Sequence, residues 1–256
     1  MDFGIIGGTG FCSADQPTEG ELLTLNTRYG VVEVERTRWR EVEVAFVPRH
    51  GRGHTVPPHR VNYRGNIEAL KELGVKNILA SAAVGSLSEN IPPGALVAVD
   101  QFLDFTRGRP STFFDGDGGE VIHVDMTDPY CPHLRGEIET AARAIGERVQ
   151  VGGTYVCAEG PRFESAAEIR MFRQLGGDVV GMTSLPEVVL AREVAICYAT
   201  VAVVTNWAAG VSNQPLSHGE VSGFMDEQTP RVRALFEQVV RTHTEVACSC
   251  RTQAAE

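Results

Sequence analysis

The chain has 256 residues, of which 43% are hydrophobic and 22% charged, and its formal net charge at pH 7 is −10. This composition is that of an ordinary globular protein and excludes disordered, collagenous and coiled-coil chains. The net acidity, without a cluster of Lys and Arg, argues against nucleic acid and membrane partners but leaves small anionic substrates open. No apolar run approaches the roughly 18 residues of a membrane span. No signal peptide is visible either, so we expect a cytoplasmic protein.

Short apolar strands alternate with helical patterns along the chain. Strands are predicted over residues 3–6, 31–35, 42–47, 77–81, 95–99, 149–156, 178–182 and 196–205, with a glycine turn at residues 85–86. Helices are predicted over residues 62–73, 132–148, 165–175, 186–193 and 220–243, the last broken or restarted at Pro230. This alternation predicts an α/β fold in which helices flank a central mixed β-sheet. No linker composition interrupts it, so residues 1–256 are expected to form a single domain.

The cysteines do not predict a metal site. Four of the six are scattered singly, as expected of buried thiols in a reducing compartment: Cys12, Cys131, Cys157 and Cys197. Cys248 and Cys250 form a C-x-C pair, which is not the usual zinc-ligand spacing, and no second pair is present.

Several predicted strands end in residues suited to binding an anion. Glycines 7, 8 and 10 allow backbone N–H groups to approach an anion closely, and Thr9 adds a hydroxyl. Arg49 and His50 follow the strand at 42–47, and the fork of an arginine matches phosphate oxygens. Further donors come from Ala82, Ala83 and Thr183. Because ligands bind beyond the carboxyl ends of strands in such sheets, these residues together predict a phosphate site.

The first glycine segment matches neither of two standard phosphate-binding motifs. It lacks the third glycine of a dinucleotide fingerprint, since Ser13 stands there, and no Lys-Ser/Thr pair follows as in a P-loop. A plain tight turn is the structural alternative.

The loop at residues 158–164 sets an aromatic ring beside a carboxylate. Phe163 can stack on a flat heterocycle and Glu164 can accept hydrogen bonds from ring N–H groups. Alternatively, Glu164 or Glu168 caps the helix that follows.

Ordered motifs along nearly the whole chain carry a resemblance to a known family. They are residues 4–10 (GIIGGTG), 48–54 (PRHGRGH) with 61–63 (VNY), 83–87 (AVGSL), 128–132 (DPYCP), 159–163 (EGPRF) and 181–189 (GMTSLPEVV). In these motifs the chain resembles the trimeric branch of the purine nucleoside phosphorylases and methylthioadenosine phosphorylases. The resemblance implies phosphorolysis, in which inorganic phosphate is a co-substrate and neither a metal nor an organic cofactor takes part. It also implies a homotrimer, or a dimer of trimers.

The resemblance assigns roles to individual residues. It implies that phosphate is bound by Thr9, Arg49, His50, Ala83 and Thr183. Phe163 would stack near the base and Met182 would lie under the ribose. His123 would reach the sugar pocket of the neighbouring subunit.

Departures from the adenine-specific members predict a 6-oxopurine substrate. Those members carry Asp-x-Asp where this chain has Asn206, Trp207 and Ala208. An Asn side chain can donate to O6 and accept from a protonated N7 together, and donation to O6 stabilises the departing base. Glu164 matches the oxopurine members, where a carboxylate accepts from N1–H. Trp207 has no assigned role, and Ala208 leaves space where the second Asp would stand.

His218 bears on the sugar. Oxopurine members place a His at this point to bond the ribose 5′-hydroxyl, whereas methylthio-specific members have a small apolar residue. We therefore assign Asn206, Glu164 and His218 to catalysis and expect inosine or guanosine as substrate. S-methyl-5′-thioinosine is the second candidate substrate, and methylthioadenosine is a further alternative. For His218, the structural alternative is a helix cap or a surface residue. A non-catalytic nucleoside-binding module and a Rossmann-type dehydrogenase are the competing classes.

Overall fold

Strands from the whole length of the chain join one mixed β-sheet in the computed structural model, which describes residues 1–11, 20–119, 121–212 and 217–251. The described part of the sheet has eleven strands, with the order β2-β3-β4-β1-β5-β10-β9-β7 and with β11, β6 and β8 branching from β5. This arrangement confirms the predicted α/β class with a mixed central sheet.

The middle of the sheet is parallel. β5 (Asn77–Ser86) pairs in parallel with β1 (Phe3–Gly7) and with β11 (Cys197–Trp207), and β1 pairs in parallel with β4 (Val42–Pro48). β2 (Glu21–Thr27) and β3 (Gly30–Trp39) extend β4 as an antiparallel meander. The remaining strands are β6 (Leu96–Ala98), β7 (Gln101–Phe105), β8 (Val149–Val151), β9 (Thr154–Ala158) and β10 (Val179–Gly181).

The sheet divides along β5. Residues 77–80 of β5 pair with β1, whereas Gly85 and Ser86 pair with β10 on the same edge. The short stretch between them has no strand partner on this edge among the described residues. Because every other N–H of a strand points to one edge, backbone donors of this stretch are available to something other than a strand.

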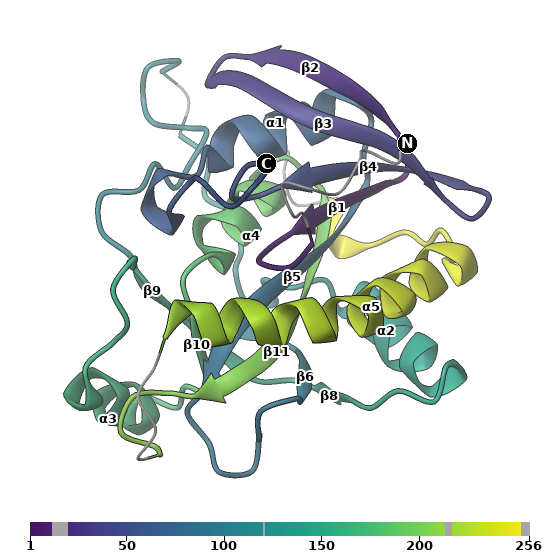
Figure 1. Ribbon diagram of the computed structural model, residues 1–256. Helices are drawn as coiled ribbons and strands as arrows, with labels where there is room; N and C mark the ends of the chain where they lie inside the picture. The colour runs from purple at the N-terminus through teal and green to yellow at the C-terminus, as the bar shows by residue number, and fades with distance from the viewer. Residues whose placement is uncertain (12–19, 120, 213–216, 252–256) are drawn as a thin grey trace.

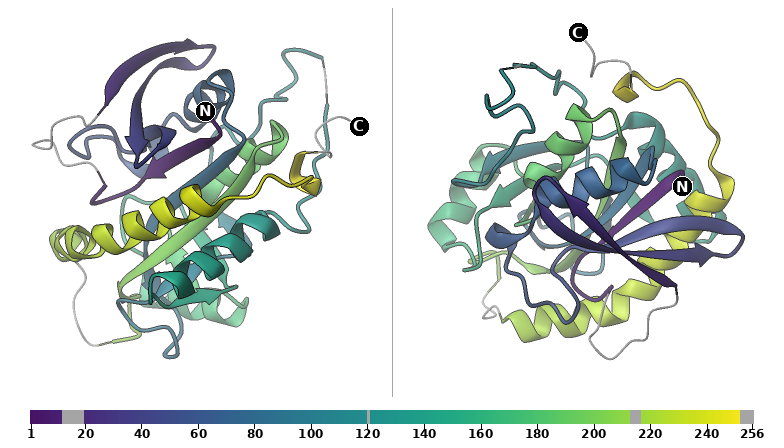
Figure 2. Two further views of the ribbon diagram at one scale, coloured as in Figure 1. Left: turned by 90° about the vertical axis from the view of Figure 1, so that its right-hand side faces the viewer. Right: turned by 90° about the horizontal axis from the view of Figure 1, so that it is seen from above.

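Helices cover both faces of the sheet (Figures 1 and 2). α1 (Tyr63–Glu72) and α4 (Ser184–Glu193) pack together on one face, where Leu70 and Val188 join one core. α2 (Pro132–Ala144) and α5 (His218–Thr242) pack together on the other, with Ile138 and Phe236 in a second core. α3 (Ala166–Gln174) follows β9, and two 3₁₀ turns lie at η1 (Pro58–Arg60) and η2 (Ser249–Arg251).

The structure corrects several predicted boundaries. β2 and β7 were not predicted, and the strand predicted at 149–156 divides into β8 and β9 at two glycines with positive φ, Gly152 and Gly153. Gly85 and Ser86 belong to β5 and do not form a turn. α5 is not broken at Pro230: the helix continues because Met225 and Val232, on either side, are both fully buried.

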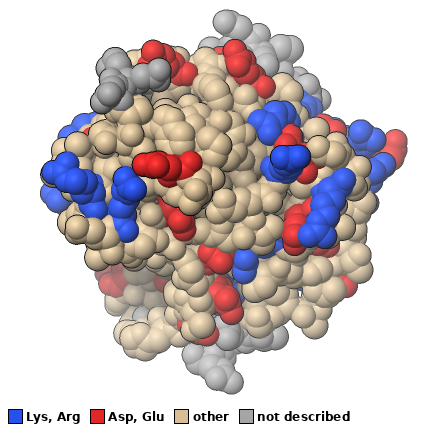
Figure 3. All heavy atoms as spheres, turned by 90° about the horizontal axis from the view of Figure 1, so that it is seen from below, with Lys and Arg blue, Asp and Glu red and all other residues tan. Residues whose placement is uncertain are grey.

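Charges of both signs are interspersed on the face shown in Figure 3, and most of that face is neither acidic nor basic. Within the described ranges, no helix is both long and apolar enough to cross a membrane.

Candidate active site

A cavity of about 330 Å³ lies where β5 parts from its neighbours. It is lined by residues that follow β1, β4 and β9, by the open stretch of β5, and by the ends of β10 and β11. Among the predicted site residues, those that line it are Thr9, Arg49, His50, Ala82, Ala83, Phe163, Glu164, Met182, Thr183, Asn206 and Ala208. Segments far apart in the sequence therefore meet in one place, as the strand-end argument predicted, although Ala82 and Ala83 lie within β5 and not beyond its end.

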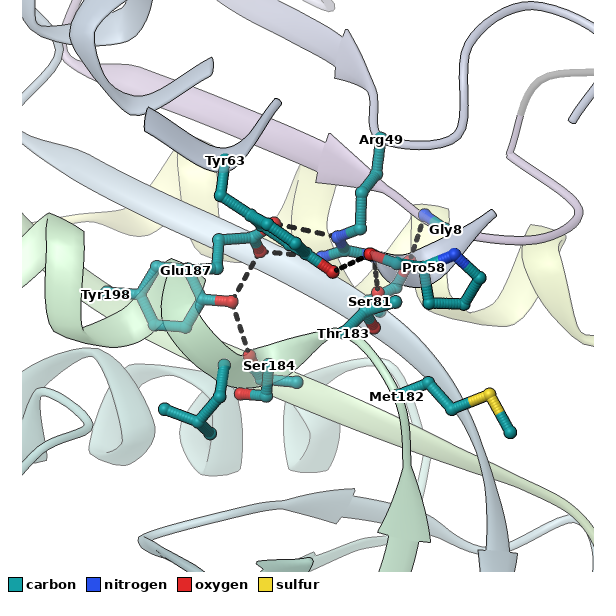
Figure 4. Close-up of polar contacts among 12 residues, drawn as sticks. Gly8, Arg49, Pro58, Tyr63, Ser81, Met182, Thr183, Ser184, Glu187 and Tyr198 are labelled. Carbon is teal, nitrogen blue, oxygen red and sulfur yellow. Dashed lines mark hydrogen bonds and ion pairs between the residues drawn. The ribbon is translucent and has the colours of Figure 1, made fainter. Parts of the chain in front are cut away.

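A buried ion pair lies beneath one end of the cavity (Figure 4). Arg49 Nε and Nη2 donate to the two carboxylate oxygens of Glu187 at 2.8 and 2.7 Å, and Nη1 donates to the Ser81 carbonyl at 2.8 Å. The side chains of Arg49 and Glu187 are only 1% and 0% exposed. Tyr198 completes the network by donating to Glu187 at 2.6 Å.

This network keeps Arg49 charged and fixed. Burial by itself would lower the pKa of Arg49, but the Glu187 carboxylate raises it above its ordinary value. A guanidinium has five N–H donors; Glu187 and Ser81 take three of them, and Arg49 is among the residues that line the cavity. Arg49 thus has two further N–H donors for an anion, held in a fixed position. The carboxylate of Glu187 balances the positive charge of its guanidinium.

Small and polar groups surround Arg49. Gly8 donates its N–H to Ser81 Oγ at 3.2 Å, and a Cβ on Gly8 would lie 3.0 Å from the Ser81 carbonyl and 3.1 Å from Arg49 Nη1, so a glycine fits here. The ring of His50 bonds the Val56 carbonyl through Nδ1 at 2.8 Å. A carbonyl only accepts, so Nδ1 carries a proton.

An irregularity in β11 brings two adjacent side chains into the cavity. The pairing of β11 with β5 shifts between Val204 and Asn206, which makes Thr205 an extra residue, a β-bulge. Both Thr205 and Asn206 consequently line the cavity, although neighbours in a regular strand point to opposite faces. The Thr205 hydroxyl donates to Asn206 Oδ1 at 2.7 Å, and Asn206 Nδ2 donates to the Trp207 carbonyl at 2.8 Å. These two bonds hold the amide with one N–H and one acceptor position to spare.

Glu164 lies buried in the cavity wall without compensation. Its side chain is 9% exposed, and its Oε1 atom has no hydrogen-bond partner in the described part of the chain. Burial raises the pKa of this carboxyl. It does not cap α3, because Ser165 and Glu168 form the capping box there. A buried acceptor left unpaired costs about 1–3 kcal/mol, so this oxygen is placed to receive a donor from a ligand.

Sequence reasoning missed Arg109, which organises the loops around the cavity. It donates to the carbonyls of Met182 and Leu185 at 2.8 and 2.7 Å, and to the carbonyl of Glu159 at 2.7 Å. Its guanidinium also donates to Tyr63 Oη at 3.2 Å. It lies in an irregular loop with no flanking motif, so only its tertiary contacts identify it. Glu187 stands within the motif at residues 181–189, but the motif does not reveal that it pairs with Arg49.

Three predicted residues are not among the cavity lining. Trp207 is half-buried and lies outside it, which agrees with its having no assigned role. His123 is exposed on an irregular segment and does not reach the cavity of its own chain, so its role toward a neighbouring subunit stays a prediction. His218 begins α5, but its side chain lies outside the described residues.

Comparison with known proteins shows the family of the chain. A probable 6-oxopurine nucleoside phosphorylase of Dictyoglomus turgidum is 50% identical over 257 residues, covering 100% of this chain and 97% of the relative. A probable S-methyl-5′-thioinosine phosphorylase of Methanopyrus kandleri is 49% identical, covering 93% and 91%. The methylthioadenosine phosphorylase of Schistosoma mansoni in complex with adenine superposes with a TM-score of 0.89 at 33% identity, covering 94% of this chain and 91% of its own. The family model of the phosphorylase superfamily matches residues 2–241, and the chain belongs to this superfamily.

Proposed function

We propose that the chain cleaves 6-oxopurine nucleosides, inosine and guanosine, with inorganic phosphate, releasing the base and ribose 1-phosphate in purine salvage. The observation that carries this proposal is the unpaired, buried Oε1 of Glu164 in the same cavity as Asn206. Both 6-oxopurines carry an N1–H that this oxygen can accept, and guanine adds a 2-amino group. Adenine has no N1–H and would leave the carboxylate unpaired.

Asn206 supplies the complementary half of base recognition. With Oδ1 and one Nδ2 hydrogen already engaged by Thr205 and the Trp207 carbonyl, the remaining N–H suits O6 and the remaining acceptor position suits a protonated N7. When the bond between the anomeric carbon and N9 breaks, its electron pair goes to the base. N7 takes a proton from solvent, and donation from Asn206 to O6 together with this protonation stabilises the charge that develops on the base.

The other end of the cavity holds the phosphate in this proposal. Arg49, His50, Thr183 and the backbone donors near Ala83 surround it, and a phosphate oxygen attacks the anomeric carbon as the base leaves. Positioning and electrostatic stabilisation supply the catalysis. The proposed reaction needs no metal or organic cofactor.

The second candidate substrate is S-methyl-5′-thioinosine. It shares the oxopurine base, and the Methanopyrus relative bears that activity in its name. His218 decides between the two in our reading, because an imidazole suits a 5′-hydroxyl better than a methylthio group. His218→Val should therefore weaken turnover of inosine more than that of methylthioinosine; equal losses would remove this role.

A matched substrate panel tests the proposal. Phosphorolysis is measured on inosine, guanosine, adenosine, methylthioinosine and methylthioadenosine, with and without phosphate. Phosphate-dependent turnover of inosine or guanosine, with adenine nucleosides silent, is expected; release of no base at all would identify a binding module. Asn206→Asp should shift preference toward adenosine because a carboxylate cannot donate to O6, whereas Asn206→Leu should lose inosine turnover without that gain.

We also propose a homotrimer in the cytoplasm, as the resemblance and the thiol chemistry imply. The described cysteines are all free thiols, which suits a reducing compartment. Sedimentation equilibrium should give three times the 27.7 kDa of one chain, or six times for a dimer of trimers. A monomeric mass would contradict it.

A further inference from the structure

Four cysteines from three distant parts of the chain meet in the core. The Sγ atoms of Cys131, Cys197, Cys248 and Cys250 all lie within 4.8 Å of one another, and all four residues are buried. None of them lines the cavity. Cys248 and Cys250 are an isolated pair in the sequence, whereas the fold brings Cys131 and Cys197 beside them.

The backbone around this cysteine cluster is held by the fold. Cys131 is the N-cap of α2, and its N–H donates to the Tyr198 carbonyl at 2.8 Å. Cys197 is the first residue of β11 and donates to the Lys76 carbonyl at 3.0 Å. Two of the four ligand positions are therefore fixed by the sheet and its neighbouring helix, and the C-terminal segment brings the other two.

The spacing of the sulfur atoms fits a tetrahedral metal. A Zn–S bond of about 2.3 Å places the four sulfurs of a Cys₄ site about 3.8 Å apart. The Sγ atoms of Cys131 and Cys248 are 3.5 Å apart, and the others lie within the 4.8 Å limit.

Positive charge lies close to the cluster. Arg192 interacts electrostatically with Cys250. Arg251 interacts electrostatically with Cys197. Four thiolates around one Zn²⁺ carry a net charge of −2, which such cations stabilise, whereas two neutral disulfides would make no use of them.

We propose that Cys131, Cys197, Cys248 and Cys250 bind one zinc ion as a structural site. Each thiol loses its proton to solvent on binding, and four protein ligands leave no open coordination position, so the metal takes no part in catalysis. The site fastens the C-terminal segment, including η2, to the start of α2 and the start of β11.

Metal content and thiol content test this proposal together. The full-length protein is produced with zinc in the medium and purified without chelator, and zinc is measured by elemental mass spectrometry. Free thiols are then titrated with Ellman's reagent in denaturant and chelator, without reductant. We expect about one zinc per chain and six titratable thiols, the full cysteine content of the sequence.

Variants localise the metal. Cys248→Ser and Cys250→Ser should each lose the bound zinc, whereas Cys157→Ala, which removes a buried cysteine outside the cluster, should retain it. Chelation should lower the Tm of the wild-type protein and leave that of Cys250→Ser unchanged.

Two results on the wild-type protein would overturn the proposal, whether or not the variants fold. Titration of only Cys12 and Cys157 would show that the cluster forms two disulfides. Six thiols with no bound zinc, even after anaerobic reconstitution with zinc chloride, would show that the cluster is a set of packed thiols.

Discussion

Replacing Glu187 by glutamine tests how the buried ion pair prepares the cavity for phosphate. The substituted side chain would keep one carbonyl for Arg49 but would turn an amide N–H₂ toward the other Arg49 donor. The guanidinium, 1% exposed, would then lack a counter-charge. Removing one partner of a buried ion pair costs about 3–5 kcal/mol. For a chain of this size we expect the Tm to fall by about 6–20 °C in phosphate-free buffer.

Phosphate should reverse part of this loss. If the cavity holds the anion against Arg49, phosphate supplies the negative charge that Glu187→Gln removes, and it stabilises the variant more than the wild type by binding only the folded state. The measurement is the Tm of both proteins across a phosphate titration, with chloride of equal ionic strength as the control.

Tyr198→Phe is the matched control. It removes the hydrogen bond of 2.6 Å to Glu187 and the one of 3.0 Å that Thr200 donates to the Tyr198 hydroxyl, without changing the charge of the pair. The cost should be about 0.5–1.5 kcal/mol for each bond, equal with and without phosphate. A Glu187→Gln deficit that phosphate leaves unchanged would refute the placement of the anion against Arg49. No deficit at all would refute the ion pair's contribution to stability.

Three further variants test the base end and the loops. Glu164→Gln should reduce kcat/KM for inosine by about 5- to 150-fold, since the pairing of a buried polar group is worth about 1–3 kcal/mol. The same variant should be more stable than wild type at pH 7: burial raises the pKa of Glu164 above its ordinary 4.5, so wild-type stability falls as pH rises through that raised pKa. Denaturant unfolding should show this advantage vanishing below about pH 4.5, and an advantage at every pH would point to another cause. Thr205→Val should lower kcat/KM for inosine by about 2- to 13-fold by freeing the Asn206 amide, the equivalent of one hydrogen bond; an unchanged value would mean that Asn206 is held without Thr205. Arg109→Lys should raise KM for the nucleoside more than KM for phosphate, because a lysine cannot reach the several carbonyls around Met182; equal changes in steady-state assays would assign it a general structural role.

The sequence predicted the cavity lining better than the support beneath it. Thr9 lies between two glycines after β1, and Arg49 follows β4, where local pattern and parallel-sheet geometry together place side chains at one edge. Glu187 stands within the motif at residues 181–189, but its role was not predicted because its partner Arg49 is 138 residues away in the sequence.

Misplaced boundaries have a similar origin. Gly85 and Ser86 were predicted as a turn from composition, but pairing with β10 and β11 keeps them extended. Pro230 was expected to break α5, but burial of the flanking side chains outweighs the loss of one helical hydrogen bond. In both cases tertiary contacts override a local preference.

The bulge in β11 affects how the lining of this pocket can evolve by deletion of a residue. Val204 pairs with Val84 and Asn206 with Gly85, so Thr205 has no partner of its own in β5. Deleting the Thr205 codon would remove a hydroxyl from the pocket and leave every other residue of the strand opposite its present neighbour. A one-residue shift within a regular strand turns its side chains to the opposite face. This deletion would instead change the lining of the pocket and keep the pairing of the sheet.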